Sequence, residues 1–185
     1  MGELVADLFI SLDGFAGGED VGPFFGYGGP ELDRWIGEHM AEPQEVVLGR
    51  RTYEALASIS AGATDQASRR LTEVPKLVVS RTLREPLAWA NTRLLAGDGC
   101  EALAAVKAAS PLPLRTMGSM TLVRSLVGAG LVDRLRLTVF PLILGPRGRE
   151  PAFAGMPTER LHLDTTQVLD GRILSLEYQL DAGGR

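Results

Sequence analysis

Short apolar runs alternate with segments of helical periodicity along most of the chain. The apolar runs end at turn residues and predict strands over residues 4–12, 46–48, 77–79, 94–95 and 114–117. Apolar side chains at three- and four-residue spacing predict helices over residues 31–40, 52–59, 99–109 and 121–127, with a short helix from a cap at Thr64 or Asp65 to Leu71. Strands that alternate with helices predict a largely parallel sheet that is covered by helices on both faces.

The C-terminal part of the chain has a different pattern. Residues 132–144 form a long apolar run that predicts one further strand, and residues 161–180 alternate around Asp170-Gly171. An Asp-Gly pair between alternating segments is a strong signal for a type I′ hairpin, which would add antiparallel strands at one edge of the sheet. No internal repeat or linker divides the chain. We therefore expect a single α/β domain over residues 1–185, with a three-layer αβα architecture and a mixed, mostly parallel sheet.

One segment near the N-terminus shows neither the alternation of a strand nor the three- and four-residue spacing of a helix. Residues 14–30 hold seven glycines together with Phe15, Phe24, Phe25 and Tyr27. Glycines supply hinges and aromatic rings supply contact area, so this segment could be a lid over a ligand. A surface loop without a binding role has the same composition, and both interpretations stay open.

Composition and charge narrow the class of protein. A chain of 185 residues that is 45% hydrophobic can bury one substantial core, and its formal net charge of -4 lacks the basic footprint of a nucleic-acid binder. We therefore expect no nucleic-acid partner. The N-terminus carries acid where a secretory signal needs base, and no apolar run reaches bilayer length, so we expect a cytoplasmic protein without a membrane partner.

The cysteine and histidine content argues against metal and disulfide chemistry. Cys100 is the only cysteine, which excludes an intrachain disulfide and a thiolate zinc site. His39 and His162 lie far apart and neither has metal-ligand spacing around it, so we expect no metal site. Cys100 could be a nucleophile, but a small buried apolar role fits its surroundings better.

The segment Val46-Val47-Leu48-Gly49-Arg50-Arg51-Thr52-Tyr53-Glu54 has the layout of a phosphate site. An apolar strand stops at Gly49, and a helix is predicted to start just after it. A helix N-terminus presents free backbone N–H groups and the positive end of its dipole, and Arg50 and Arg51 would add two full charges beside them. The alternative is that the two arginines form only a solvated corner.

Two other turns follow predicted strands and suit phosphate in the same way. They are Ser80-Arg81-Thr82 and Gly118-Ser119-Met120-Thr121. Gly118 would let the backbone approach a pyrophosphate, while Ser119 could donate to phosphate or simply cap the following helix. An arginine beside the adenosine ribose favours NADP over NAD, which makes Arg50 or Arg81 a candidate for that contact. Together the three turns suit a dinucleotide, although the chain has no G-x-G-x-x-G fingerprint.

These turn motifs and their order along the chain resemble the dihydrofolate-reductase-like family. The resemblance is in particular to the reductase domain of the bifunctional riboflavin-biosynthesis protein RibD and its stand-alone relatives. The resemblance covers nearly the whole chain. It rests on Ser11-Leu12-Asp13-Gly14, Leu48 to Glu54, Val79-Ser80-Arg81-Thr82-Leu83, Gly97-Asp98, Gly118-Ser119 with Leu122, and Gly130-Leu131-Val132-Asp133 running to Leu144-Gly145.

The resemblance implies an NADPH-dependent reductase that transfers a hydride to a small heterocyclic, pterin- or aminopyrimidine-like, or carbonyl substrate. Carried over from the family, the adenosine end of NADPH would be held by Gly49, Arg50, Arg51, Thr52, Ser80 and Arg81, and the pyrophosphate by Gly118 and Ser119. Asp13 would lie on the substrate side, where a carboxylic acid or a water that it orients can supply a proton. Relatives are commonly dimers, which makes a homodimer the expected assembly.

Two departures from the family pattern concern the substrate. The chain has Val132-Asp133-Arg134 where the family often has Val-Asp-Glu, and Gly145-Pro146-Arg147-Gly148 where it often has several glycines. We expect both changes on the substrate side, and they argue against the ribosylated aminopyrimidine of the riboflavin pathway. A non-catalytic NADP-binding module is the competing hypothesis. Asp13 could equally serve to close a turn, and no motif singles out Glu31, Asp33 or Glu38 on the first predicted helix as a substrate ligand.

Overall fold

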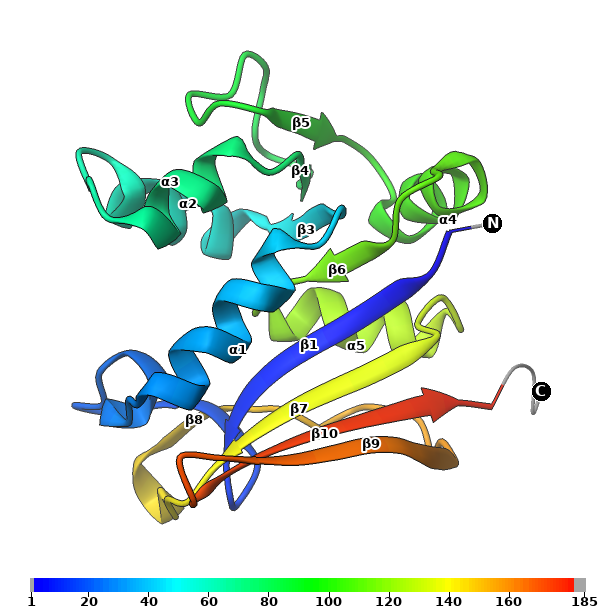
Figure 1. Ribbon diagram of the computed structural model, residues 1–185. Helices are drawn as coiled ribbons and strands as arrows, with labels where there is room; N and C mark the ends of the chain where they lie inside the picture. The colour runs from blue at the N-terminus through cyan, green and yellow to red at the C-terminus, as the bar shows by residue number, and fades with distance from the viewer. Residues whose placement is uncertain (1, 182–185) are drawn as a thin grey trace.

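Eight strands form one mixed sheet at the centre of the computed structural model, which describes residues 2–181 (Figure 1). In spatial order they are β5 (Thr92–Leu95), β4 (Lys76–Val79), β3 (Glu45–Gly49), β6 (Leu114–Thr116), β1 (Leu4–Ser11), β7 (Arg134–Phe140), β10 (Ile173–Leu180) and β9 (Leu161–Leu169). Pairing is parallel from β5 to β7, whereas β10 is antiparallel to both β7 and β9. The mostly parallel sheet with an antiparallel hairpin at one edge is therefore confirmed.

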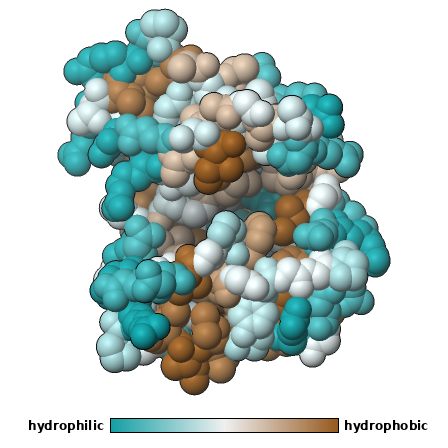
Figure 2. Space-filling model, turned by 90° about the vertical axis from the view of Figure 1, so that its left-hand side faces the viewer, coloured by the Kyte–Doolittle hydropathy of each residue, from teal (hydrophilic) through white to brown (hydrophobic). Residues whose placement is uncertain are grey.

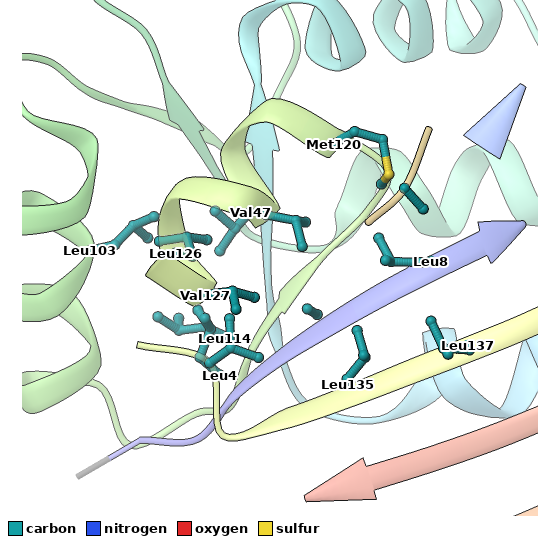
Figure 3. Packing of buried hydrophobic residues seen from close by; sticks show 14 of the residues in the cluster. Leu4, Leu8, Val47, Leu103, Leu114, Met120, Leu126, Val127, Leu135 and Leu137 are labelled. Carbon is teal, nitrogen blue, oxygen red and sulfur yellow. The ribbon is translucent and has the colours of Figure 1, made fainter. Parts of the chain in front are cut away.

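Five helices cover the two faces of the sheet. They are α1 (Pro30–Ala41), α2 (Arg50–Ser60), α3 (Gln66–Glu73), α4 (Gly99–Ala109) and α5 (Met120–Gly128). Along β1, Leu4 and Leu8 lie in the largest hydrophobic cluster together with Met120 and Leu126 of α5 (Figure 3), whereas Phe9 packs in the cluster that contains Trp35 of α1. Because successive strand residues face opposite sides, helices lie on both faces, and the αβα layers are confirmed. None of the described helices is long and apolar enough to cross a bilayer.

The structure differs from the sequence prediction in the loops beyond β1 and β7. The predicted strand over 132–144 is shorter, because the ladder ends at Phe140 and Pro141 follows. Within the glycine-rich segment, β2 (Phe15–Gly18) pairs antiparallel with β8 (Gly148–Pro151) as a separate ribbon, and short 3-10 turns occupy Pro23–Gly26 and Gly145–Arg147. Four residues with two glycines give no alternation, so only the distant partner strand makes β2 a strand.

The hairpin turn between β9 and β10 has the positive φ angles that an Asp-Gly type I′ turn requires. They are 50° at Asp170 and 66° at Gly171. The Asp170 carboxylate also accepts hydrogen bonds from the backbone N–H groups of Glu31 (3.1 Å) and Leu32 (3.0 Å) at the start of α1, and the Glu31 carboxylate accepts from the Asp170 N–H in return. A Cβ at Gly29 would lie 2.2 Å from the Asp170 carboxyl carbon, so this close contact needs glycine. The hairpin therefore supplies the N-cap of α1.

Lys76, the first residue of β4, is another polar side chain with a structural role. It is 1% exposed, and its ammonium donates to the carbonyl groups of Leu71 (2.9 Å), Thr72 (2.9 Å) and Val74 (2.8 Å) at the end of α3. The amine also lies 4.6 Å from the centre of the Trp89 ring. Burial lowers the pKa of Lys76 to about 8, because removal from water penalises the charged form.

Replacement of Asp170 by glycine should lower the free energy of unfolding by about 1–2 kcal/mol, because α1 loses its cap while glycine tolerates the positive φ. Asp20, which also has a positive φ of 55°, provides the matched control for the backbone effect as Asp20→Gly. Asp170→Asn keeps one acceptor oxygen and should fall in between. Urea unfolding measures all three, and equal stability of the two glycine variants would contradict the capping role.

The lowered pKa of Lys76 has a defined effect on stability. The unfolded amine titrates near 10.5 and the folded amine near 8. Below pH 8 both states carry the proton and the burial penalty is complete, whereas between pH 8 and 10.5 the folded state releases its proton first, so its stability rises with pH. We expect the stability of wild type relative to Lys76→Met to increase by at most about 3 kcal/mol over this range. Urea unfolding from pH 7 to 10.5 would refute this if the difference stays constant.

Candidate functional site

A cleft of about 1060 Å³ opens beside the carboxyl ends of the parallel strands. Its walls come mainly from four segments, residues 49–52 after β3, 80–82 after β4, 97–100 before α4 and 119–122 at the start of α5, together with Glu150 of β8. Figure 2 views the molecule from the side where β6 and β1 end, and the surface there is hollowed between its upper and lower parts. Ligands of open α/β sheets bind at this edge.

The turns after β3 and β6 are joined by one side chain. The Ser119 hydroxyl accepts a hydrogen bond from the Gly49 N–H (2.8 Å) and donates to the Thr52 hydroxyl (2.8 Å). Gly118 precedes this side chain with a φ of 59°, a left-handed conformation that favours glycine. Ser119 occupies the N-cap position of α5 with a φ of 62°, but its hydroxyl makes no cap bond to that helix, so the capping alternative is replaced by a bridge between the two turns.

The bridge brings the N-termini of α2 and α5 to the same wall of the cleft. Within the described chain, neither helix has a side-chain cap bond or an acidic residue in its first turn. Helix α2 begins at Arg50, two residues earlier than the periodicity predicted. Two uncapped N-termini side by side supply N–H donors and positive dipole ends, which is the arrangement that binds phosphate.

The arginines of the cleft differ in their partners. Arg50 pairs with Glu54 one turn along α2 (3.0 Å), and Arg51 reaches Glu150 of β8 (3.8 Å). Arg124 donates to the Met120 carbonyl within α5 (3.2 Å). Within residues 2–181, the Arg81 guanidinium has no hydrogen bond or ion pair. Arg81 is therefore the cleft arginine whose guanidinium donors are all available to a ligand. Arg124 also has no carboxylate partner, but it donates to two backbone carbonyl groups.

Ser80 explains how Arg81 is presented. The Ser80 hydroxyl accepts from the N–H groups of Thr82 (3.1 Å) and Leu83 (3.0 Å), which closes a tight turn after β4. After the next strand along the chain, Asp98 caps α4 by accepting from the Cys100 N–H (2.8 Å). Ser80 therefore holds the turn, and its neighbour Arg81 meets the cleft.

Seven of the eight predicted cofactor residues line the cleft, and Gly118 directly precedes one of them. Their cofactor role stays a prediction, but the structure brings them together as the motif order implies. Gly99, Arg124 and Glu150, to which no sequence motif pointed, also line the cleft, and so does Cys100. A Cβ on Gly99 would lie 2.2 Å from Val79, so this glycine permits the close approach of α4 to β4. Burial, and then the Asp98 carboxylate, raise the pKa of the Cys100 thiol, which makes it a poor nucleophile.

Asp13 does not line the cleft but ties two loops together. Its carboxylate accepts from the Ser11 hydroxyl (2.7 Å) and from the N–H groups of Leu144 (3.1 Å) and Gly145 (2.8 Å). The Ser11 bond in particular lowers the pKa of Asp13, so the group is an anion at neutral pH and accepts rather than donates protons. These hydrogen bonds support the alternative in which Asp13 closes a turn. The catalytic role of Asp13 stays a prediction.

Of the two departures from the family pattern that we expected on the substrate side, the one at Arg134 lies away from it. Arg134 begins β7 and pairs in register with Val5 near the start of β1, so it lies at the amino ends of the parallel strands, whereas the cleft lies at their carboxyl ends. The expectation that this change touches the substrate side is therefore wrong, because residues that begin a parallel strand lie about one strand length from those that end it. The other departure, at residues 145–148, does lie beside Asp13.

In the described residues no group of three histidine, cysteine or carboxylate side chains could hold a metal ion.

Comparison with known proteins finds a family model and several solved structures that are similar to the chain. A family model of the RibD C-terminal domain matches residues 3–175. A putative riboflavin biosynthesis protein from Shewanella sp. PV-4 has a similar structure, with a TM-score of 0.74 and 20% identity over 98% of this chain and 99% of that one. A pyrimidine reductase-like protein from Corynebacterium diphtheriae gives a TM-score of 0.69 with 16% identity, covering 98% and 93%.

RibD from Acinetobacter baumannii is similar over a part of its length. The TM-score is 0.72 and the identity 17%, with 98% of this chain but only 58% of RibD covered. The chain thus spans little more than half of that protein. At these identities the likeness establishes the fold, and the dihydrofolate-reductase-like architecture with RibD-like neighbours is confirmed. No curated protein sequence matches the chain.

Loss of the Ser119 hydroxyl should separate the two turns. In Ser119→Ala the Gly49 N–H and the Thr52 hydroxyl lose a partner in a half-buried place, and we expect a loss of about 1–2 kcal/mol in the free energy of unfolding. Ser125, whose hydroxyl bonds only to the Thr121 carbonyl within α5, provides the control as Ser125→Ala. If urea unfolding gives the same small loss for both, the bridge does not hold the site together.

Proposed function

The chain belongs to the RibD C-terminal domain family, and on that premise we propose that it is a reductase that uses NADPH to reduce a small heterocyclic or carbonyl substrate. The observation that carries the proposal is the Ser119 bridge, which sets two uncapped helix N-termini at the wall of a cleft that also holds four arginines. A diphosphate with a further phosphate on the adenosine ribose matches this distribution of positive charge.

The residues present fit such a cofactor. The pyrophosphate would meet the N–H groups at the start of α5, where Gly118 leaves the backbone free of side-chain bulk. The adenosine end would lie against the turns at Gly49 and Ser80. When bound, NADPH supplies the hydride, whereas the side chains of this chain bind and orient its phosphates.

The choice of NADPH over NADH rests on Arg81. Arg50 and Arg81 are both placed to meet a 2′-phosphate, but Arg50 is already paired with Glu54. A new contact by Arg50 must replace an existing ion pair, whereas Arg81 has no such cost. We therefore infer that Arg81 makes the main contact with the 2′-phosphate and that Arg50 adds a smaller, longer-range attraction.

On the substrate side, Asp13 and the Leu144-Gly145 backbone form one unit. As an anion, Asp13 orients a substrate or a water, and a proton reaches the product from that water rather than from Asp13 itself. The structural neighbours include proteins described as a riboflavin biosynthesis protein and a pyrimidine reductase-like protein. By extension we propose a heterocyclic substrate, with a carbonyl compound as the alternative.

A non-catalytic NADP-binding module remains the second candidate. It is favoured by the hydrogen bonds of Asp13, which engage both carboxylate oxygens with protein donors and leave fewer acceptor positions for a substrate. The altered residues at 145–148 lie at the same place. Binding without turnover would result if this unit serves only to close the loops.

Arg81→Ala should weaken NADPH binding about 10- to 100-fold and leave NADH binding nearly unchanged, because one charge-assisted contact to the 2′-phosphate is lost. Arg50→Ala should have a smaller effect, and the exposed Arg69 on α3 provides a control remote from the cleft. Thermal stabilisation of each variant by the two nucleotides measures the preference. Equal stabilisation of wild type by NADPH and NADH would contradict the proposed contact.

Turnover separates the two candidates. Oxidation of NADPH can be followed in the presence of dihydropterins, aminopyrimidine ribosides and quinones. A reductase should consume NADPH with at least one of these classes, at a rate that falls in Arg81→Ala through KM. Tight NADPH binding with no oxidation across the panel would favour the binding module instead.

A further inference from the structure

The ion pair between Arg51 and Glu150 joins two separate walls of the cleft. Both side chains line the cleft, but they come from different elements. Arg51 lies in the first turn of α2, and Glu150 lies in β8 of the β2–β8 ribbon. Arg50, in contrast, pairs with Glu54 on its own helix. The Arg51 pair therefore connects the helix wall to the ribbon.

This pair crosses the carboxyl end of β6. In the sheet, β6 lies between β3, which leads into α2, and β1, which leads into β2 of the ribbon. A contact from Arg51 to Glu150 therefore passes over the turn at Gly118 and Ser119, from which α5 begins. The uncapped N-terminus of α5 presents its N–H groups at the same place.

Charge alone holds the pair together. The Arg51 Nη1 and Glu150 Oε1 atoms are 3.8 Å apart, which is too long for a hydrogen bond, and more than half of each side chain is exposed. Arg50, by comparison, donates two hydrogen bonds of 3.0 Å to the Glu54 carboxylate. Exposed pairs without hydrogen bonds contribute little to stability. Arg51 therefore changes its partner more readily than Arg50 does.

The backbone of Glu150 has an unfavourable conformation. Its φ is 56°, in the left-handed region, and Pro151 follows it. The left-handed region disfavours residues that have a Cβ, and the residue before a proline favours extended backbone. Residues held in such conformations cluster at ligand clamps and switch regions. The strain is evidence for a role of Glu150 in the cleft, because a residue that only stabilised the ribbon would gain from a relaxed backbone.

The charge of Glu150 opposes the charge that the cleft binds. Among the described residues that line the cleft, the carboxylates are those of Asp98 and Glu150. The Asp98 carboxylate is engaged as the cap of α4, where it accepts from the N–H groups of Cys100 and Glu101. Glu150 instead faces Arg51, so a phosphate at that guanidinium is repelled by Glu150 and competes with it.

We propose that Glu150 is a counter-ion that holds Arg51 until a phosphate of the incoming ligand displaces it. The phosphate carries more charge than a carboxylate and gains the N–H groups of α5 as further donors, so it replaces Glu150 at Arg51. Glu150 then repels the bound phosphate and favours its release. The identity of the ligand as NADPH rests on the proposed function, whereas the exchange of partners applies to any phosphate in the cleft.

Calorimetric titration with inorganic pyrophosphate and with NADPH tests the exchange. Glu150→Gln keeps the size of the side chain and removes its charge, so it should bind both ligands about three- to fivefold more tightly than wild type. The gain should shrink as ionic strength rises, because salt screens the repulsion. Glu19→Gln is the matched control, since Glu19 follows β2 in the same ribbon, pairs with Arg149 and does not line the cleft.

The two ligands separate this proposal from the proposed function. Tighter pyrophosphate binding by Glu150→Gln without any binding of NADPH would support the exchange and contradict the cofactor. Equal pyrophosphate affinity of Glu150→Gln, Glu19→Gln and wild type, or no pyrophosphate binding by any of them, would overturn the exchange.

A double variant shows whether Glu150 acts through Arg51. Arg51→Ala should weaken pyrophosphate binding, and the addition of Glu150→Gln to it should improve binding less than the same change does in wild type. The reason is that the guanidinium for which phosphate and carboxylate compete is gone. An equal gain in both backgrounds would refute the exchange of partners.

Glu150→Gly separates a role in the cleft from a structural role. Glycine tolerates the positive φ, so this variant should be at least as stable as wild type in urea and should bind pyrophosphate as tightly as Glu150→Gln does. Loss of stability with unchanged pyrophosphate affinity would assign the ion pair to the structure of the ribbon and contradict the proposal.

Discussion

The hydrogen bonds of the Ser119 hydroxyl fix the relation between the two strand ends on which the cleft is built. Gly49 and Ser119 are 70 residues apart in the chain, yet the Ser119 oxygen meets the Gly49 N–H directly. Because β3 and β6 are neighbours in a parallel sheet, their carboxyl ends lie about 5 Å apart, and one short side chain can span them. The N-termini of α2 and α5 follow from these ends, so their dipoles converge on the same wall.

Carboxylate side chains of the protein neutralise two of the four arginines around this wall. Glu54 and Glu150 hold two of the arginines, while Arg81 extends from a turn that the Ser80 hydroxyl closes. Charged side chains also have partners within the protein beneath α1. There Asp7 in the middle of β1 pairs with Arg115 of β6, and the Arg136 guanidinium lies 5.8 Å from the centre of the Trp35 ring.

Sequence reasoning succeeded where a signal is contained in a few adjacent residues. The strand that stops at Gly49 and the hairpin turn at Asp170 are both marked by turn residues beside a short periodic segment. It failed at β2 and β8, whose pairing joins segments 130 or more residues apart, and at Arg134, which lies at the amino ends of the parallel strands, away from the cleft. The homodimer and the cytoplasmic location stay predictions.

The sequence by itself determined the order of strands and helices and the residue types at each turn, because periodicity and turn chemistry are local. It also carried the family resemblance, on which the proposed function rests. Only the tertiary structure decided that Ser119 bridges two turns, that Asp13 bonds to the backbone at 144–145, and that Arg81 rather than Arg50 has no side-chain partner among residues 2–181. These outcomes depend on which distant groups meet, and hydrogen bonds and ion pairs form only between groups that the packing of the sheet brings within about 3–4 Å.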